Sequence, residues 1–206
     1  MPLSRDRILS RALALADRNG LDSVSMRTLA VAVGVEAMSL YKHVASKDGL
    51  LDGVADLVLR EIWTPTPTLS WRTAMRRRAV SCHEVLRHPW ATALIESRHY
   101  QSDVRLAYAN AVLGILIEAG FACANAYQGF ITLDSFVYGF TLQDVNWADG
   151  AEEAQTSAKH MLLEKYPYLA QDLAQVMRKF ADRPKSNSLS LRIGIRVWSR
   201  LAVGPS

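Results

Sequence analysis

Apolar residues recur at spacings of three and four along most of the chain, which is the pattern of amphipathic helices. No stretch shows the sustained apolar–polar alternation, rich in β-branched residues, that predicts strands. The pattern therefore predicts an all-α protein. The first helix is expected over 5–19, with Ser4 as its N-cap and Gly20 at its end.

Three further helices are predicted to follow the first one, over 26–33, 36–43 and 46–63. Pro65 and Pro67 then stand two residues apart, and a helix cannot continue through such a segment. We expect a domain boundary there, between a first domain over 1–63 and a second over 64–206. The helices of the second domain are predicted over 70–87, 90–96, 102–119, 123–149, 152–164, 167–180 and 188–203.

The segment 25–44 has the pattern of a helix-turn-helix. Gly34 can adopt the left-handed conformation that ends the first of its two helices, and Val35 can then enter the core. The inner face is formed by Leu29, Ala30, Val33, Val35, Leu40 and Val44. Such a motif places its second helix in the major groove of DNA and its first helix across the backbone.

The second helix of this motif has an outward face that suits DNA. Ala37, Met38 and Tyr41 offer apolar contact, which suits thymine methyl groups. His43 and Lys47 offer donors for phosphates, and Arg27 could reach a guanine edge. The alternatives remain open at this point, because Tyr41 also suits packing and the basic residues also suit a solvated surface.

The first 63 residues resemble the N-terminal domain of the TetR family of transcriptional regulators. The resemblance rests on the Ser25-x-Arg27-x-Leu29-Ala30 opening, on Gly34-Val35-Glu36, and on Leu40-Tyr41-x-His43-Val44-x-x-Lys47-x-x-Leu50-Leu51. It is strongest to the tetracycline-repressor branch and extends more weakly into the second domain. It implies a sequence-specific regulator, most simply a repressor, that a small-molecule effector releases from a palindromic operator.

The resemblance also implies roles for single residues. In that family the residues at Tyr41 and before Ser39 contact bases, those at His43 and Lys47 approach phosphates, and the one at Arg27 can contact a guanine. Met38 stands where that branch often carries Pro, so a different sequence preference is expected. The candidate DNA-binding residues are Arg27, Thr28, Ala37, Met38, Ser39, Tyr41, Lys42, His43 and Lys47.

Two long helices of the second domain suit a dimer interface. The predicted helix 123–149 is apolar on nearly every side, and a helix of that kind must be buried on every side. The predicted helix 188–203 has apolar residues opposite a stripe of arginines. The resemblance implies a homodimer through these two helices. The alternative from the residues alone is a monomeric bundle core.

A ligand site in the second domain is expected around Asp134, a polar residue on an otherwise apolar helix. The candidate ligand-binding residues are His83, Trp90, Tyr108, Asn110, Tyr127, Asp134 and Tyr138. The resemblance argues against tetracycline, since Trp63 and Arg78 fall where metal–tetracycline repressors place His and Asn. An aromatic or polycyclic effector is expected instead.

Arginines 76, 77 and 78 are consecutive and cannot form one basic face, because they span most of a helix circumference. They are predicted to be solvated charges with one intramolecular pair. A contact with a ligand carboxylate, or a link between the domains, is the alternative.

Composition and charge limit the classes of protein that this chain can belong to. The chain has 206 residues and a net charge of +4, with six basic and two acidic residues over 64–100 and balanced charge elsewhere. It has no segment long and apolar enough for a signal peptide or a membrane span. With only Cys82 and Cys123, no disulfide framework is expected. The expected location is the bacterial cytoplasm, at the nucleoid.

The sequence gives little support to an enzyme. His83 and His88 nearly form a zinc-protease motif, but the second His comes five residues after the first, about 140° away around the helix. No cofactor motif is found, so no cofactor or metal is expected. The alternative outside catalysis is a helical dimeric adaptor that binds only protein. Arg27, Tyr41, His43 and Lys47 together favour the DNA-binding regulator.

Overall fold

The computed structural model describes residues 3–86, 88, 90–98, 102–143 and 194–195. The predicted helices over 152–164 and 167–180, and all of 188–203 except residues 194 and 195, lie outside the described residues. Within the described part, every regular element is helical, which agrees with the all-α prediction. None of the helices in this part is long and apolar enough to cross a membrane.

The N-terminal helices begin and end close to where the sequence predicts. The first helix, α1, spans Arg5–Asn19, and the short 3-10 helix η1 spans Leu21–Ser23. The helix α2 spans Met26–Val33, and α4 spans Lys47–Glu61. Side-chain oxygens of Ser4, Ser25 and Ser46 accept hydrogen bonds from the first turns of α1, α2 and α4, so each helix starts at a serine N-cap.

The helix α3 is shorter than predicted and spans only Ala37–Leu40, while residues 41–43 form a turn. The backbone N–H of Ser39 donates to Glu36 O, and that of His43 donates to Leu40 O, both at 2.9 Å. These bonds join residues three apart, as in a 3-10 helix. The segment 37–43 therefore remains one compact helical unit, although only its first part is α-helical.

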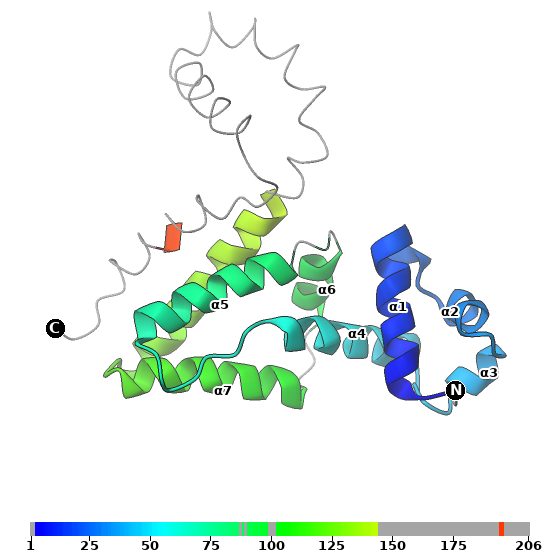
Figure 1. The fold of residues 1–206 in the computed structure, drawn as a ribbon, viewed down its shortest axis with the longest axis horizontal. Helices are drawn as coiled ribbons and strands as arrows, with labels where there is room; N and C mark the ends of the chain where they lie inside the picture. The colour runs from blue at the N-terminus through cyan, green and yellow to red at the C-terminus, as the bar shows by residue number, and fades with distance from the viewer. Residues whose placement is uncertain (1–2, 87, 89, 99–101, 144–193, 196–206) are drawn as a thin grey trace, which may run out of the picture.

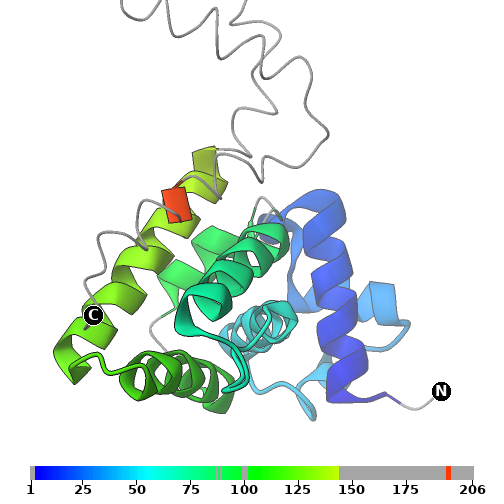
Figure 2. The same cartoon turned by 60° about the vertical axis from the view of Figure 1, so that its left-hand side comes forward.

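The second group of helices begins after the segment 64–70. It consists of α5 (Trp71–Val85), α6 (Ala91–Ser97), α7 (Asp103–Glu118) and a helix that covers 123–143. Figure 1 shows α1, α2 and α3 at one end of the molecule, and α5, α6 and α7 at the other, with α4 running between them. Figure 2 shows the 123–143 helix in yellow-green alongside α5, with its lower end next to α7.

The helix α4 packs against both groups. It contacts α1 on one side, and α6 and α7 on the other. Its buried side chains Leu50, Val54, Val58 and Ile62 belong to one hydrophobic cluster that runs through both groups. A displacement of α4 must therefore change the packing in both groups of helices.

The described part of the last predicted helix packs within the chain. Residues 194 and 195 are helical, and Ile195 is buried. A Cβ atom at Gly194 would overlap the Phe136 ring of the 123–143 helix. Gly194 therefore permits a close approach of these two helices inside one chain. Gly139, by contrast, has no neighbour within 4 Å that a Cβ would meet.

Candidate DNA-binding interface and buried polar centre

The turn between α2 and α3 depends on Gly34. Its φ is 78° and its ψ is 39°, which is the left-handed region. The backbone N–H of Gly34 donates to Ala30 O at 2.9 Å, and that of Val35 donates to the same oxygen at 3.0 Å. These bonds close the end of α2, as predicted, and direct the chain into α3 at a fixed angle.

The outer side of α3 and the following turn carries exposed side chains. Met38 is 72% exposed and Tyr41 is 44% exposed, whereas Leu40 between them is fully buried. Lys42 is exposed as well, while Ala37, Ser39 and His43 are half-buried. We call Met38, Tyr41 and Lys42 the recognition surface. The large apolar groups of Met38 and Tyr41, exposed on α3 and the turn after it, do not form a packing face within the chain and are available to a partner.

Two further candidates lie beside the recognition surface. Lys47 is exposed at the start of α4, where the Ser46 hydroxyl accepts from Gly49 N at 3.0 Å. Arg27 is exposed in the first turn of α2. Backbone N–H groups at a helix start and basic side chains both favour an anion.

The side chain of Thr28 forms hydrogen bonds that stabilise the start of α2. Its Oγ1 accepts from the backbone N–H of Ser25 at 3.0 Å and lies 2.7 Å from Ser23 O, to which it donates. The Ser25 hydroxyl accepts from Thr28 N at 3.1 Å, which completes a capping box. The hydroxyl proton of Thr28 is therefore used at the start of α2.

An acidic stripe on α4 is bound by the second group of helices. Asp48 and Asp52 both accept from Arg98, which follows α6: Arg98 Nε lies 2.5 Å from Asp52 Oδ1, and Nη1 lies 3.0 Å from Asp48 Oδ1. Arg98 also donates to the backbone oxygen of Asp48 at 3.1 Å. One turn further along α4, Asp56 accepts from the hydroxyl of Ser102, the N-cap of α7, at 2.7 Å. These contacts, which we call the α4 clasp, reach the end of α4 that carries Lys47.

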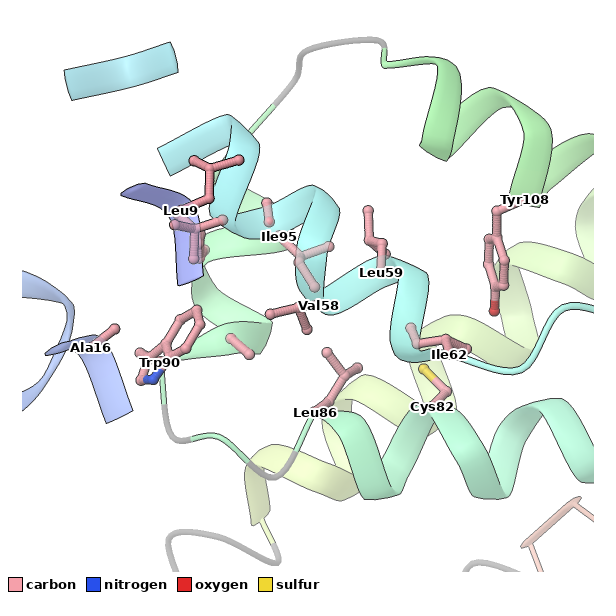
Figure 3. Close-up of a cluster of buried hydrophobic side chains, with 14 of the residues drawn as sticks. Leu9, Ala16, Val58, Leu59, Ile62, Cys82, Leu86, Trp90, Ile95 and Tyr108 are labelled. Carbon is pink, nitrogen blue, oxygen red and sulfur yellow. The ribbon is translucent and has the colours of Figure 1, made fainter. Parts of the chain in front are cut away.

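A second polar contact joins α1 to the segment before α6. Trp90 Nε1 donates to Asp17 Oδ1 at 3.0 Å, and His88 Nδ1 lies 2.6 Å from the same oxygen. Figure 3 shows Trp90 beside Ala16 of α1, at the opposite end of the cluster from Tyr108. Trp90, expected near a ligand, thus lies at the junction of the two groups. His83 bonds Thr141 instead, so the two histidines of the near-motif point to different elements.

The strongest polar interaction inside the second group joins three distant segments. Arg78 of α5 is fully buried and forms an ion pair with Asp134 of the 123–143 helix. Its Nε donates to the Tyr108 hydroxyl of α7 at 2.6 Å. The guanidinium carbon lies 5.1 Å from the centre of the Tyr108 ring and 5.0 Å from that of Phe130. We call Arg78, Tyr108, Asp134 and Tyr138 the buried polar centre.

Burial and the ion pair control protonation in this centre. Burial alone would lower the pKa of Arg78, but the neighbouring groups, Asp134 first among them, together outweigh this effect and raise it, so the guanidinium stays charged. Burial raises the pKa of the Asp134 carboxyl, and Arg78 opposes that shift. Burial also raises the pKa values of Tyr108 and Tyr138, and that of Cys82 to about 12, so all three remain neutral at physiological pH.

The structure brings together some of the expected ligand-binding residues. Tyr108 and Asp134 both contact Arg78, and Tyr138, one turn after Asp134, lies within electrostatic range of these groups. His83 follows on the buried side of α5, with its Nδ1 2.9 Å from Thr141 Oγ1. Tyr127 is 52% exposed, and Asn110 is exposed, so neither belongs to the buried polar centre.

Arg78 was not among the expected ligand-binding residues, although an intramolecular ion pair was expected for one of the arginines at 76–78. A signal for it was present in the sequence. The buried side of α5 consists of Ala74, Met75, Arg78, Ala79, Cys82 and His83. Arg78 therefore occupies a position of the apolar stripe, whereas Arg76 and Arg77 are exposed.

Comparisons with known proteins agree with this architecture. The family model of bacterial regulatory proteins of the tetR family matches residues 8–54, and that of the tetracyclin repressor-like C-terminal domain matches residues 64–193. A helix-turn-helix transcriptional regulator from Saccharopolyspora erythraea is 34% identical over 174 residues, which cover 82% of this chain and 74% of that protein.

Solved structures share the fold. Apo ActR from Streptomyces coelicolor is 26% identical, with a TM-score of 0.75 over 98% of this chain and 97% of that one. BioQ in complex with its double-stranded DNA operator is 27% identical, with a TM-score of 0.62 over 70% of this chain and 89% of that one. A helix-turn-helix precedes a helical ligand-binding domain here, and the second family match alone covers more than half of the sequence. The chain belongs to the TetR family of bacterial transcriptional regulators.

Proposed function

We propose that this regulator is a dimeric repressor, which binds a palindromic operator and is released from it by a small-molecule effector. The observation that carries the proposal is the recognition surface, where Met38, Tyr41 and Lys42 stand exposed on the second helix of a helix-turn-helix and the turn that follows it. The structure of BioQ with its operator, and the match to a tetracyclin repressor-like domain, support the same function. Such a protein acts at the nucleoid.

The proposed DNA contacts divide into two kinds. Met38, Tyr41, Ala37 and Ser39 face base edges, with Arg27 reaching a guanine. Lys42, His43 and Lys47 bind phosphates and set the orientation of the helix. Thr28 contributes through the start of α2, since its hydroxyl is used in the capping box.

Dimerisation is proposed through the helices over 123–149 and 188–203. In the single chain, the 123–143 helix buries Ala126, Leu133 and Val137 on one side but leaves the large apolar side chains of Tyr127, Ile131 and Leu142 between 40% and 52% exposed. A partner chain would cover these groups. The segment 37–43 measures only about 12 Å and contacts few base pairs, so specificity requires two copies spaced by about one DNA turn.

The two domains, divided near residue 63, are proposed to communicate through α4. This helix carries Lys47 at one end and the buried side chains Leu59 and Ile62 at the other. The α4 clasp fixes its acidic stripe to Arg98 and Ser102 of the second domain. An effector that shifts α6 or α7 would therefore move α4 and change the separation of the two recognition helices.

Selection of bound duplexes from a random library tests DNA recognition. The wild-type protein should enrich a palindrome, and a Tyr41→Ala/Lys47→Ala variant should not, because it lacks one proposed base contact and one phosphate contact. Both residues are exposed, so the variant should keep its fold and its dimer. Folded, dimeric wild-type protein that enriches no sequence, before and after refolding without ligand, would favour the protein-binding adaptor.

The selected operator then permits a test of regulation. Linkage requires that operator DNA weaken effector binding by the same factor by which the effector weakens operator binding. Effector affinity measured by calorimetry should therefore fall when the operator is present. Equal affinities with and without operator would contradict the proposed release mechanism.

A further inference from the structure

The buried polar centre contains a charged donor without an acceptor. Two of the three nitrogens of the Arg78 guanidinium are used, because Nε donates to Tyr108 and Nη2 pairs with Asp134. The third, Nη1, is buried and has no hydrogen-bond partner among the residues that the structure describes. Buried donors in native proteins almost always have a partner, so this nitrogen marks a position where an acceptor belongs.

Packing alone gives no reason for this arrangement. An ion pair in the interior is no more stabilising than apolar residues of similar volume. Arg78 and Asp134 nevertheless form such a pair between α5 and the 123–143 helix, with Arg78 on the otherwise mostly apolar buried side of α5. A few polar groups converging in an apolar interior are typical of a ligand site.

The charges and rings around Nη1 define the kind of acceptor. Arg78 and Asp134 cancel each other, and Tyr108, Tyr138 and Cys82 are neutral. A carboxylate would add a negative charge that no group balances, whereas a carbonyl oxygen would accept from Nη1 without adding one. The Tyr108 and Phe130 rings beside the guanidinium suit a flat aromatic body.

We propose that the effector is an uncharged aromatic ketone whose carbonyl oxygen accepts a hydrogen bond from Nη1 of Arg78. This inference rests on the proposed function and names the ligand class of its second domain. Because Nη1 is covered, a ligand that bonds it must move the side chains around it. Ligand binding is thereby linked to a rearrangement between α5, α7 and the 123–143 helix, as a switch requires.

Three pairs of probes test the ligand class on the full chain. The ketones are 9-fluorenone, xanthone and anthrone, and their counterparts, in which a CH2 group replaces the carbonyl, are fluorene, xanthene and 9,10-dihydroanthracene. At least one ketone should raise the melting temperature and bind about 10- to 100-fold more tightly than its counterpart, the range expected for a hydrogen bond from a charged donor. A charged analogue, 9-fluorenone-2-carboxylate, should bind more weakly than 9-fluorenone.

A pair of variants tests the donor. In Arg78→Met/Asp134→Leu the ion pair is replaced by apolar side chains of similar volume, so the fold should be kept. This variant should bind a ketone and its counterpart equally. The carbonyl stretching band of the bound ketone should lie at lower frequency in the wild-type protein than in the variant. Arg78→Lys, which keeps the charge but has fewer donors, should show an intermediate preference.

Each outcome has a defined meaning. The inference is wrong if no ketone stabilises the wild-type protein, if the carboxylate binds more tightly than the ketone, or if the double variant keeps the ketone preference. Operator binding, measured on the same samples, separates this failure from that of the proposed function. An operator that is bound while all ketones fail would leave DNA recognition standing and exclude only this ligand class. A ketone that binds without releasing the operator would support the site and contradict the proposed release.

Discussion

Polar side chains serve opposite purposes at the two ends of this molecule. Around α2 and α3 they are exposed, and their hydrogen bonds join residues that are three to five positions apart, as between Ser25 and Thr28 or Thr28 and Ser23. Along the buried side of α5 they are covered, and the side-chain bonds formed by Arg78 and His83 join residues 30 to 58 positions apart.

This difference determines how well each region tolerates substitutions. The recognition surface rests on local caps and one glycine turn, so its exposed side chains can be exchanged without disturbing the fold. The buried polar centre joins three helices through charges that are shielded from solvent. Removal of one partner therefore leaves the other charge buried without a partner. Single substitutions should therefore leave stability nearly unchanged on the recognition surface, whereas in the buried polar centre both members of the ion pair must be replaced together to keep it.

The largest effect is expected from breaking the buried ion pair on one side. Asp134→Leu leaves the Arg78 charge buried without its partner, which should lower the free energy of unfolding by about 3–5 kcal/mol. Urea unfolding followed by circular dichroism measures this. The double variant Arg78→Met/Asp134→Leu should recover most of the loss. If the single and double variants were equally unstable, the lost packing, and not the stranded charge, would be the cause.

The next effect concerns the turn before the recognition helix. Gly34→Ala forces a Cβ into a left-handed backbone conformation and should cost about 1–2 kcal/mol. No atom lies within 4 Å of the position that the Cβ would take, so the cost is conformational and not a clash. Gly34→Asn should cost less, because Asn tolerates this region better. Equal losses for both variants, measured by thermal unfolding, would contradict the conformational explanation.

The same contrast explains what could be predicted from the sequence. The bounds of α1 and α2 and the turn at Gly34 depend on nearby residues such as Ser4, Ser25 and Gly20, and they were predicted closely. The family membership and the all-α fold followed from the same local pattern. The shorter α3 was not predicted. Hydrogen bonds between residues three apart and four apart are favoured by very similar sequences, so the sequence does not locate the end of so short an α-helix.

The buried polar centre could be predicted only in part. Asp134, Tyr108 and Tyr138 stood out as polar residues on apolar helices, yet nothing local shows that Arg78 pairs with Asp134, 56 positions away. Trp90 was named as a residue that could join Asp134 at a ligand site, and nothing local shows that its indole N–H donates to Asp17, 73 positions earlier. Pairs of this kind depend on how the helices pack against one another, and the spacing of apolar residues along the chain does not specify this packing.

A smaller effect is expected at the α4 clasp, where the two regions meet. Arg98→Ala removes three hydrogen bonds to Asp48 and Asp52 at a partly exposed site, and should cost about 1 kcal/mol. The first turn of α4 should then exchange its amide hydrogens faster, while α1 stays unchanged. Arg98→Lys is the matched control that keeps the charge. Unchanged exchange in Arg98→Ala would show that apolar packing alone holds α4 to the second domain.

The smallest effect on stability, with a distinct effect on binding, is expected at Lys47. Its side chain is exposed and has no ion pair among the contacts within the described residues, so Lys47→Ala should leave the free energy of unfolding unchanged. If Lys47 binds a phosphate, the variant should weaken operator and random DNA alike and reduce the slope of log K against log salt by about 0.9. Arg60→Ala, an exposed change in the last turn of the same helix, is the control that should leave the slope unaltered. Since both variants remove one positive charge, equal slopes would mean that net charge alone attracts DNA, whereas a change only at position 47 would place a phosphate at the start of α4.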